Sequence, residues 1–127
     1  MKEYALAQWQ RACQSLESAR TLLDSDYDSA ASRAFYAAYH AVTALFAWRN
    51  VAFKKHTALR AAIHRDLVAT GQWAIELGKA YDFLLELRET GDYGGPAHVE
   101  QQDAQTAIEK AGAIIAAVKV LCPDLTR

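Results

Sequence analysis

The stretch SAASRAFYAAYHAVTALFAWR, residues 29–49, decides the fold, because it carries hardly any charge from one end to the other. Alanine is interspersed in it with aromatic and aliphatic residues. As a helix from about Tyr27 to Arg49 it would be about 30 Å long. Because a helix that is apolar nearly all round has to be surrounded by other elements, the stretch predicts the central helix of a bundle.

Apolar residues recur at helical spacing on both sides of this stretch. Before it, Trp9, Cys13 and Leu16 mark one helix, and Asp24 opens a run of capping residues that separates this helix from the central one. At the other end of the chain, Pro123 stops the last helix. The predicted helices cover residues 1–23, 27–49, 57–69, 72–89 and 97–121.

Two segments that lack this spacing predict connections. Residues 50–56 (NVAFKKH) join the second and third helices. Residues Gly91 to Pro96 (GDYGGP) combine three glycines and a proline, which predicts a loop before the last helix. We therefore predict an all-α protein, an up-and-down bundle of four to five helices in one domain, residues 1–127.

The composition excludes several classes of protein. Of the 127 residues, 52% are hydrophobic and 23% are charged, with 6 glycines and 2 prolines, which excludes a disordered, collagen-like or turn-rich all-β chain. The 14 Lys and Arg residues nearly balance the 15 Asp and Glu residues, giving a net charge of −1. No overall positive field attracts nucleic acid, so any phosphate contact has to be local.

The cysteines, the histidines and the hydropathy pattern indicate a cytoplasmic protein without a metal. Cys13 and Cys122 form no CxxC pair, and we expect both to be buried free thiols. The four histidines fall on four different elements, so no metal site is predicted, and no motif predicts a cofactor. We find neither a secretory signal nor an apolar run of about 18 residues, so no membrane contact is expected.

Arg33 and His40 stand out as polar residues in the apolar central helix. They lie seven residues apart, nearly two turns, so their side chains project from one face with Tyr36 between them. An arginine in a buried helix is costly unless it is paired or faces an opening. Arg49 and His56 form a second pair across the exit of the helix, but loop residues need not point together.

Two interpretations of the first pair remain open. In the structural one, Arg33 pairs with a carboxylate such as Asp92 or Glu89, while His40 and Tyr36 satisfy each other or the backbone. In the other, this face binds phosphate, because the arginine fork matches phosphate oxygens and histidine exchanges protons near neutral pH. Arginine and histidine are sufficient for metal-independent RNA cleavage, in which a 2′-hydroxyl attacks the neighbouring phosphate.

Three blocks of the sequence resemble those of a known family in their order and spacing. SRAFYAAYH at residues 32–40 is similar to an S-R-x-Y-Y-x-x-[YF]-H helix, and KH at residues 55–56 is similar to a K-x-H segment that opens a third helix. RETGDY at residues 88–93 is similar to an R-x-x-A-D-Y block at the end of a fourth helix. Together they resemble the HEPN family (higher eukaryotes and prokaryotes nucleotide-binding), in its small, stand-alone prokaryotic branch, over essentially the whole chain.

The resemblance implies a helical bundle that usually forms a homodimer and is often encoded beside a minimal nucleotidyltransferase in a toxin–antitoxin pair. Many HEPN proteins are ribonucleases that use an R-x(4–6)-H motif at a dimer interface. Carried onto this chain, the resemblance implies Arg33 and His40 as catalytic residues, and Asp92 as a group that either orients His40 or neutralises Arg33. The nucleotide-binding or phosphate-binding positions that it implies are Arg33, Tyr36, Arg88, Tyr93 and His56.

Two functions therefore stand side by side. The first is the HEPN component of a toxin–antitoxin or defence-type module that cleaves RNA without a metal. The second is a non-catalytic module that binds a nucleotide or a minimal nucleotidyltransferase partner. A ribonuclease requires Arg33 and His40 to converge on an open groove, whereas an adaptor permits them to be sealed inside and paired.

Overall fold

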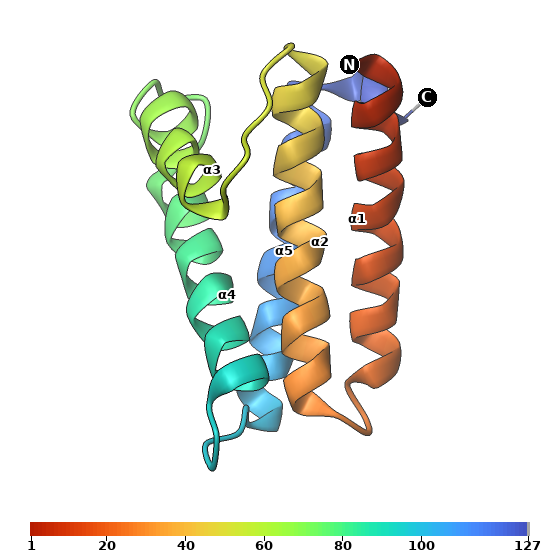
Figure 1. Cartoon of the computed structure of the whole chain (residues 1–127), viewed down its shortest axis with the longest axis vertical. Coiled ribbons are helices and arrows are strands. Elements are labelled where there is room, and N and C mark those ends of the chain that lie inside the picture. Colours follow the sequence, from red (N-terminus) through yellow and green to blue (C-terminus); the bar gives the residue numbers. More distant parts are fainter. Residues whose placement is uncertain (127) are drawn as a thin grey trace.

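The computed structural model describes residues 1–126, which form four long helices and a short one (Figure 1). Within these residues there is no strand, so the predicted all-α bundle is confirmed. The short third helix runs on into a π turn, and a 3-10 turn follows the fifth helix. The elements are α1 (Lys2–Leu22), α2 (Tyr27–Trp48), α3 (His56–Ala62), η1 (Ile63–Val68), α4 (Ile75–Tyr93), α5 (Gln101–Leu121) and η2 (Pro123–Thr126).

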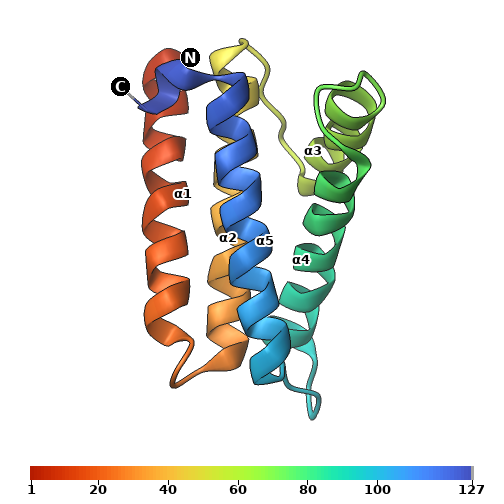
Figure 2. The same ribbon diagram turned by 180° about the vertical axis from the view of Figure 1, so that it is seen from behind.

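The helix α2 is the centre of the bundle, as its composition predicts. It packs against α1, α4 and α5, and the view from behind shows α5 crossing α2 with α1 and α4 on either side (Figure 2). Small side chains let these helices approach closely, and their burial removes apolar surface from water. The fully buried alanines of α2 are Ala30, Ala31, Ala34, Ala37, Ala38, Ala41, Ala44 and Ala47.

Both ends of α2 are closed by local hydrogen bonds. At the start, Asp26 is extended, and its carboxylate accepts hydrogen bonds from the backbone N–H and the hydroxyl of Ser29, at 3.0 and 2.6 Å. At the end, Asn50 adopts a left-handed conformation (φ 64°), and the N–H of Val51 donates to the carbonyl of Phe46. This is the Schellman arrangement that satisfies the last carbonyls of a helix.

The end of α4 lies against the start of α2. A Cβ at Gly91 would lie 2.8 Å from the carbonyl oxygen of Asp28, so the missing side chain permits this close approach. The Asp28 carboxylate then accepts a hydrogen bond from the N–H of Val99 (2.7 Å) and pairs with Nδ1 of His98 (2.6 Å). Asp28 thus fastens the segment between α4 and α5 onto α2.

Several predicted boundaries are wrong. The predicted loop Gly91–Pro96 is helical as far as Tyr93, and the chain turns only at Gly95, where φ is +60°. Here α4 continues because its packing on α2 outweighs the low helix propensity of Gly91. The fourth helix starts at Ile75 instead of residue 72, and the last at Gln101 instead of residue 97.

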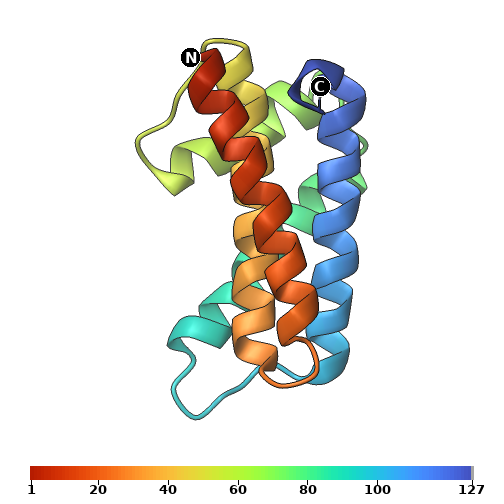
Figure 3. The ribbon, with the colours of Figure 1, turned by 90° about the vertical axis from the view of Figure 1, so that its right-hand side faces the viewer.

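The two ends of the described chain lie at the same end of the bundle (Figure 3). The prediction of two buried thiols is half right, because Cys122 is buried and Cys13 is exposed on α1. Ala5, Trp9, Ala12 and Leu16 carry the buried face of α1, and this face excludes position 13. No helix among residues 1–126 is long and apolar enough to span a membrane.

Candidate functional site

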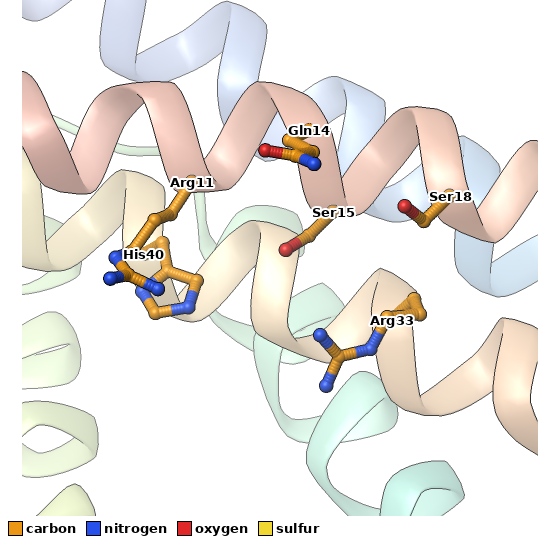
Figure 4. A pocket seen from close by; sticks show the side chains of 6 residues that line it. All are labelled: Arg11, Gln14, Ser15, Ser18, Arg33 and His40. Carbon is orange, nitrogen blue, oxygen red and sulfur yellow. The ribbon is translucent and has the colours of Figure 1, made fainter.

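A groove of about 240 Å3 lies between α1 and α2, and polar side chains line it (Figure 4). Two residues come from α2 and four from α1, so neither helix forms the groove alone. Its lining holds two arginines and a histidine but no carboxylate. The six lining residues are Arg11, Gln14, Ser15, Ser18, Arg33 and His40.

Arg33 and His40 line this groove together, as their spacing in α2 predicts. Both side chains are half-buried. In Figure 4 the guanidinium of Arg33 extends along α2 toward the ring of His40. The two residues therefore converge on one opening and are not sealed in the core.

The structural interpretation of Arg33 as the partner of Asp92 or Glu89 is wrong. Asp92 and Glu89 instead lie at 3.2 and 3.8 Å from the guanidinium of Arg88. Within residues 1–126, Arg33 forms no ion pair, and its guanidinium carbon lies over the ring of Tyr36, 4.9 Å from the centroid. Such a cation–π contact orients the guanidinium and leaves its N–H donors available to an anion.

His40 is held by a hydrogen bond from outside its own helix. Its Nδ1 lies 2.6 Å from the side-chain Oε1 of Gln8 on α1. Burial lowers the pKa of His40 to about 4, and the positive charges of Arg11 and Arg33 contribute to this. His40 is therefore neutral at pH 7 and has a free ring nitrogen that accepts a proton.

The contribution of α1 is the part of the site that the sequence interpretation missed. Gln8, Arg11, Ser15 and Ser18 stand at intervals of three and four residues, which places them on one face of α1. That polar stripe runs beside the buried apolar face of the helix. The spacing of these polar residues could have been noticed in the sequence. The sequence does not tell, however, which of the other helices this stripe faces.

The residues Arg88, Asp92 and Tyr93 form a second cluster, on α4. The guanidinium of Arg88 donates to the Asp92 carboxylate (3.2 Å) and to the hydroxyl of Tyr36 (3.0 Å). Asp92 also accepts a hydrogen bond from the hydroxyl of Ser32, at 3.2 Å. Asp92 therefore neutralises Arg88, and Tyr36 connects this cluster to the groove because it contacts both arginines.

His56 lies apart from Arg49, the other candidate pair. The His56 ring packs against the Tyr39 ring, with centroids 4.4 Å apart. Arg49 instead donates a hydrogen bond to the amide of Gln72, at 2.8 Å. No contact joins the two side chains. His56 instead lies near His40, and its electrostatic effect is one of the smaller causes that lower the pKa of His40.

The groove has the chemistry of an anion site. Arg11 and Arg33 both lack an ion-pair partner within the described chain, residues 1–126, and the serines add hydroxyl donors. Uncompensated guanidinium groups bind phosphate oxygens through charge-assisted hydrogen bonds. Across the same part of the chain, no group of three or more His, Cys, Asp or Glu side chains is arranged to hold a metal ion.

Comparison with known proteins shows the family to which this chain belongs. The family model for the HEPN domain matches residues 5–121. A UPF0332 protein of Thermotoga maritima is 37% identical over 128 residues, which cover 99% of this chain and 97% of that protein. Another UPF0332 protein, from Gloeobacter violaceus, is 36% identical over 103 residues, which cover 80% of this chain and 82% of that protein.

A more distant relative comes from an archaeon. A protein of Methanocaldococcus jannaschii named "Putative toxin" is 26% identical over 102 residues. The match covers 80% of this chain and 69% of the archaeal protein.

Proposed function

The chain belongs to the HEPN domain family, and we propose that it is the RNA-cleaving component of a toxin–antitoxin or defence-type module. The single observation that carries the proposal is the convergence of Arg11, Arg33 and His40 on one groove that holds no carboxylate. The archaeal relative named as a "Putative toxin" is consistent with such a module.

The proposed reaction is a transesterification at phosphorus that needs no metal. The neutral ring of His40 takes the proton of the RNA 2′-hydroxyl, and the oxygen attacks the adjacent phosphorus. The new 2′-O–P bond forms as the bond to the 5′-oxygen breaks, and that oxygen takes a proton from water. The products are a 2′,3′-cyclic phosphate and a 5′-hydroxyl end.

The two arginines stabilise the negative charge that gathers on the phosphate oxygens in the transition state. Arg33 is already oriented by its contact with the Tyr36 ring, so little reorganisation is required when the phosphate arrives. Arg11 approaches from the opposite wall of the groove, on α1 (Figure 4). A phosphate between the two walls would be contacted from both helices.

The bound phosphate also changes the pKa of His40. Without an anion, burial and the neighbouring cations keep the pKa of the ring low. A phosphate placed between Arg11 and Arg33 offsets their charge and raises the pKa of His40 toward its ordinary range. His40 thereby becomes a better proton acceptor in the complex than in the free protein.

The test is cleavage of labelled single-stranded RNA and tRNA in EDTA. We expect the wild type to yield fragments that end in 2′,3′-cyclic phosphates, and Arg33→Ala and His40→Ala to lose this activity by a factor of about 100 or more. Matched controls are Arg65→Ala and His98→Ala, which remove the same residue types outside the groove lining. Circular dichroism and melting curves establish that every variant is folded.

The alternative function predicts a different result from the same experiment. If the wild type leaves every RNA intact, the proposal of catalysis fails. A binding module that holds a nucleotide or a minimal nucleotidyltransferase then becomes the function to test, by calorimetry with nucleotides and by co-purification. The expected homodimer is tested separately by light scattering.

A further inference from the structure

The hydrogen bond between Gln8 and His40 joins α1 to α2 at a residue that lines the groove. Gln8 lies in α1, 32 residues before His40 in α2, and its Oε1 is 2.6 Å from Nδ1 of the imidazole. A carbonyl oxygen of an amide is only an acceptor, so the hydrogen of this bond sits on Nδ1. The other ring nitrogen, Nε2, then carries the lone pair.

We propose that Gln8 is a positioning residue that holds His40 in the Nδ1–H form, with Nε2 as its proton acceptor. The inference deepens the proposed function and rests on it, because the tautomer matters for cleavage only if His40 is the base. It names a residue outside the SRAFYAAYH block and on a different helix.

The surroundings of His40 show why an added hydrogen-bond partner is needed. The charged and titratable groups that face the ring are Arg11 from α1, Arg33 from its own helix and His56 from α3. The rings of Tyr36 and Tyr39 pack against it, with centroids 6.1 and 5.3 Å away. The two arginines can only donate hydrogen bonds, so Gln8 is the acceptor that selects between the two ring nitrogens.

A neutral amide suits this position better than a carboxylate. A glutamate at position 8 would stand three residues before Arg11, on the same face of α1, and would pair with it. It would also favour the charged form of the imidazole. Glutamine fixes the ring while Arg11 and Arg33 stay available to phosphate and His40 stays neutral.

The experiment reads the tautomer directly, without depending on cleavage. Nitrogen-15 NMR of the imidazole ring distinguishes Nδ1–H from Nε2–H, and a pH titration follows the ring of His40. The variants are Gln8→Leu, which removes the acceptor, and Gln8→Glu, which keeps the shape and adds charge. The matched control is Gln10→Leu, which changes an exposed glutamine two residues along the same helix.

The expected results differ between the variants. The wild type and Gln10→Leu give the Nδ1–H spectrum, and Gln8→Leu gives a mixture of both tautomers. Gln8→Glu keeps the Nδ1–H form and raises the pKa of His40 by about one unit. In cleavage assays, Gln8→Leu lowers kcat by roughly tenfold with little change in KM, and Gln8→Glu moves the acid limb of the pH profile upward.

Two outcomes separate this inference from the function on which it rests. An unchanged His40 spectrum in both folded Gln8 variants overturns the role of Gln8, whether or not RNA is cleaved. The expected spectra in a protein that cleaves no RNA uphold the positioning of His40 and overturn the ribonuclease. If Gln8→Leu does not fold, the titration of Gln8→Glu alone decides, because its side chain has nearly the same shape.

Discussion

The guanidinium carbon of Arg33 lies 4.9 Å from the centroid of the Tyr36 ring, one turn further along α2. This contact holds the side chain along the helix without neutralising its charge. Tyr36 is itself held, because its hydroxyl accepts a hydrogen bond from Arg88 on α4. A charge that is fixed in place and lacks a carboxylate partner within residues 1–126 is suited to binding an anion from solution.

We predict that Arg11 and Arg33 each contribute one phosphate contact. Arg11→Ala and Arg33→Ala should each weaken the binding of single-stranded RNA and reduce the slope of log affinity against log salt by about 0.7. Fluorescence anisotropy at several salt concentrations measures both quantities. Arg65→Ala is the control, because Arg65 pairs with Asp66 away from the groove. Equal effects of all three substitutions would mean that the protein binds RNA through its general charge.

We predict that His40 makes stability fall with acidity between pH 6.5 and about pH 4. In this window the unfolded chain binds a proton at His40, and the folded protein, where the pKa of His40 is about 4, does not. The free energy of unfolding therefore falls by about 1 to 2 kcal/mol between pH 7 and pH 4. The change is no larger because solvent screens part of the effect at a half-buried ring.

Thermal melts of the wild type and His40→Phe in phosphate-free buffers measure this loss. The difference between the two proteins should change by that amount between pH 7 and pH 4. A difference that stays constant with pH contradicts the prediction.

We predict that Gly91→Ala destabilises the protein by about 1 to 3 kcal/mol. The added Cβ would come within 2.8 Å of the Asp28 carbonyl oxygen, which is backbone and has to move together with α2. Gly112→Ala on α5 is the matched control, since a Cβ there meets nothing within 4 Å. It should stabilise by about 0.5 to 1 kcal/mol through helix propensity. Urea unfolding measures both, and a neutral Gly91→Ala would show that the two helices separate easily.

We predict that Asp28→Ala loosens the segment between α4 and α5. The substitution removes the acceptor for the Val99 N–H and the partner of His98, at a cost of about 1 to 2 kcal/mol. Hydrogen exchange at the Val99 amide should accelerate more than exchange in the middle of α5. If the Val99 amide stays protected from exchange in Asp28→Ala, contacts other than those of Asp28 hold this segment on α2.

The same carboxylate gives this fastening a pH dependence. Hydrogen bonds from His98 and from the Val99 N–H hold the pKa of Asp28 below its ordinary value of 3.8. The contribution of Asp28 to stability is therefore present above pH 3.8 and is lost as the pH falls through the lower pKa of the folded state. Asp28→Ala should lack this dependence in melts between pH 5 and pH 2.5.

Much of the fold was predictable because the apolar composition of α2 shows that this helix is surrounded by others. A helix that is apolar nearly all round has to be central, and the predicted span from Tyr27 to Arg49 differs from the observed Tyr27–Trp48 by one residue. The end of α4 was not predictable, because glycine lowers helix propensity at Gly91, whereas the close approach of this position to Asp28 on α2 requires a residue without a side chain. Local preference fails where packing between distant segments decides.

Half of the candidate site follows from spacing within one helix. Positions 33, 36 and 40 share a face of any helix, so the convergence of Arg33 and His40 could be expected. The roles of Gln8 and Arg11 could not, because they depend on which face of α1 meets α2. The open alternative in which Arg33 pairs with Asp92 could not be judged from the sequence for the same reason, and in the structure Arg88 on α4 pairs with that carboxylate instead.

The sequence by itself determined the all-α class, the central helix and the pair of side chains that projects from it, because these depend on periodicity along one helix. Only the tertiary structure decided that α1 supplies Arg11 to the groove and Gln8 to the ring of His40, that Asp92 neutralises Arg88, and that Asp28 holds the segment before α5. The physical reason is that hydrogen bonds and ion pairs act over a few ångströms between residues far apart in the chain. Their partners are fixed only when helices have packed in one particular register.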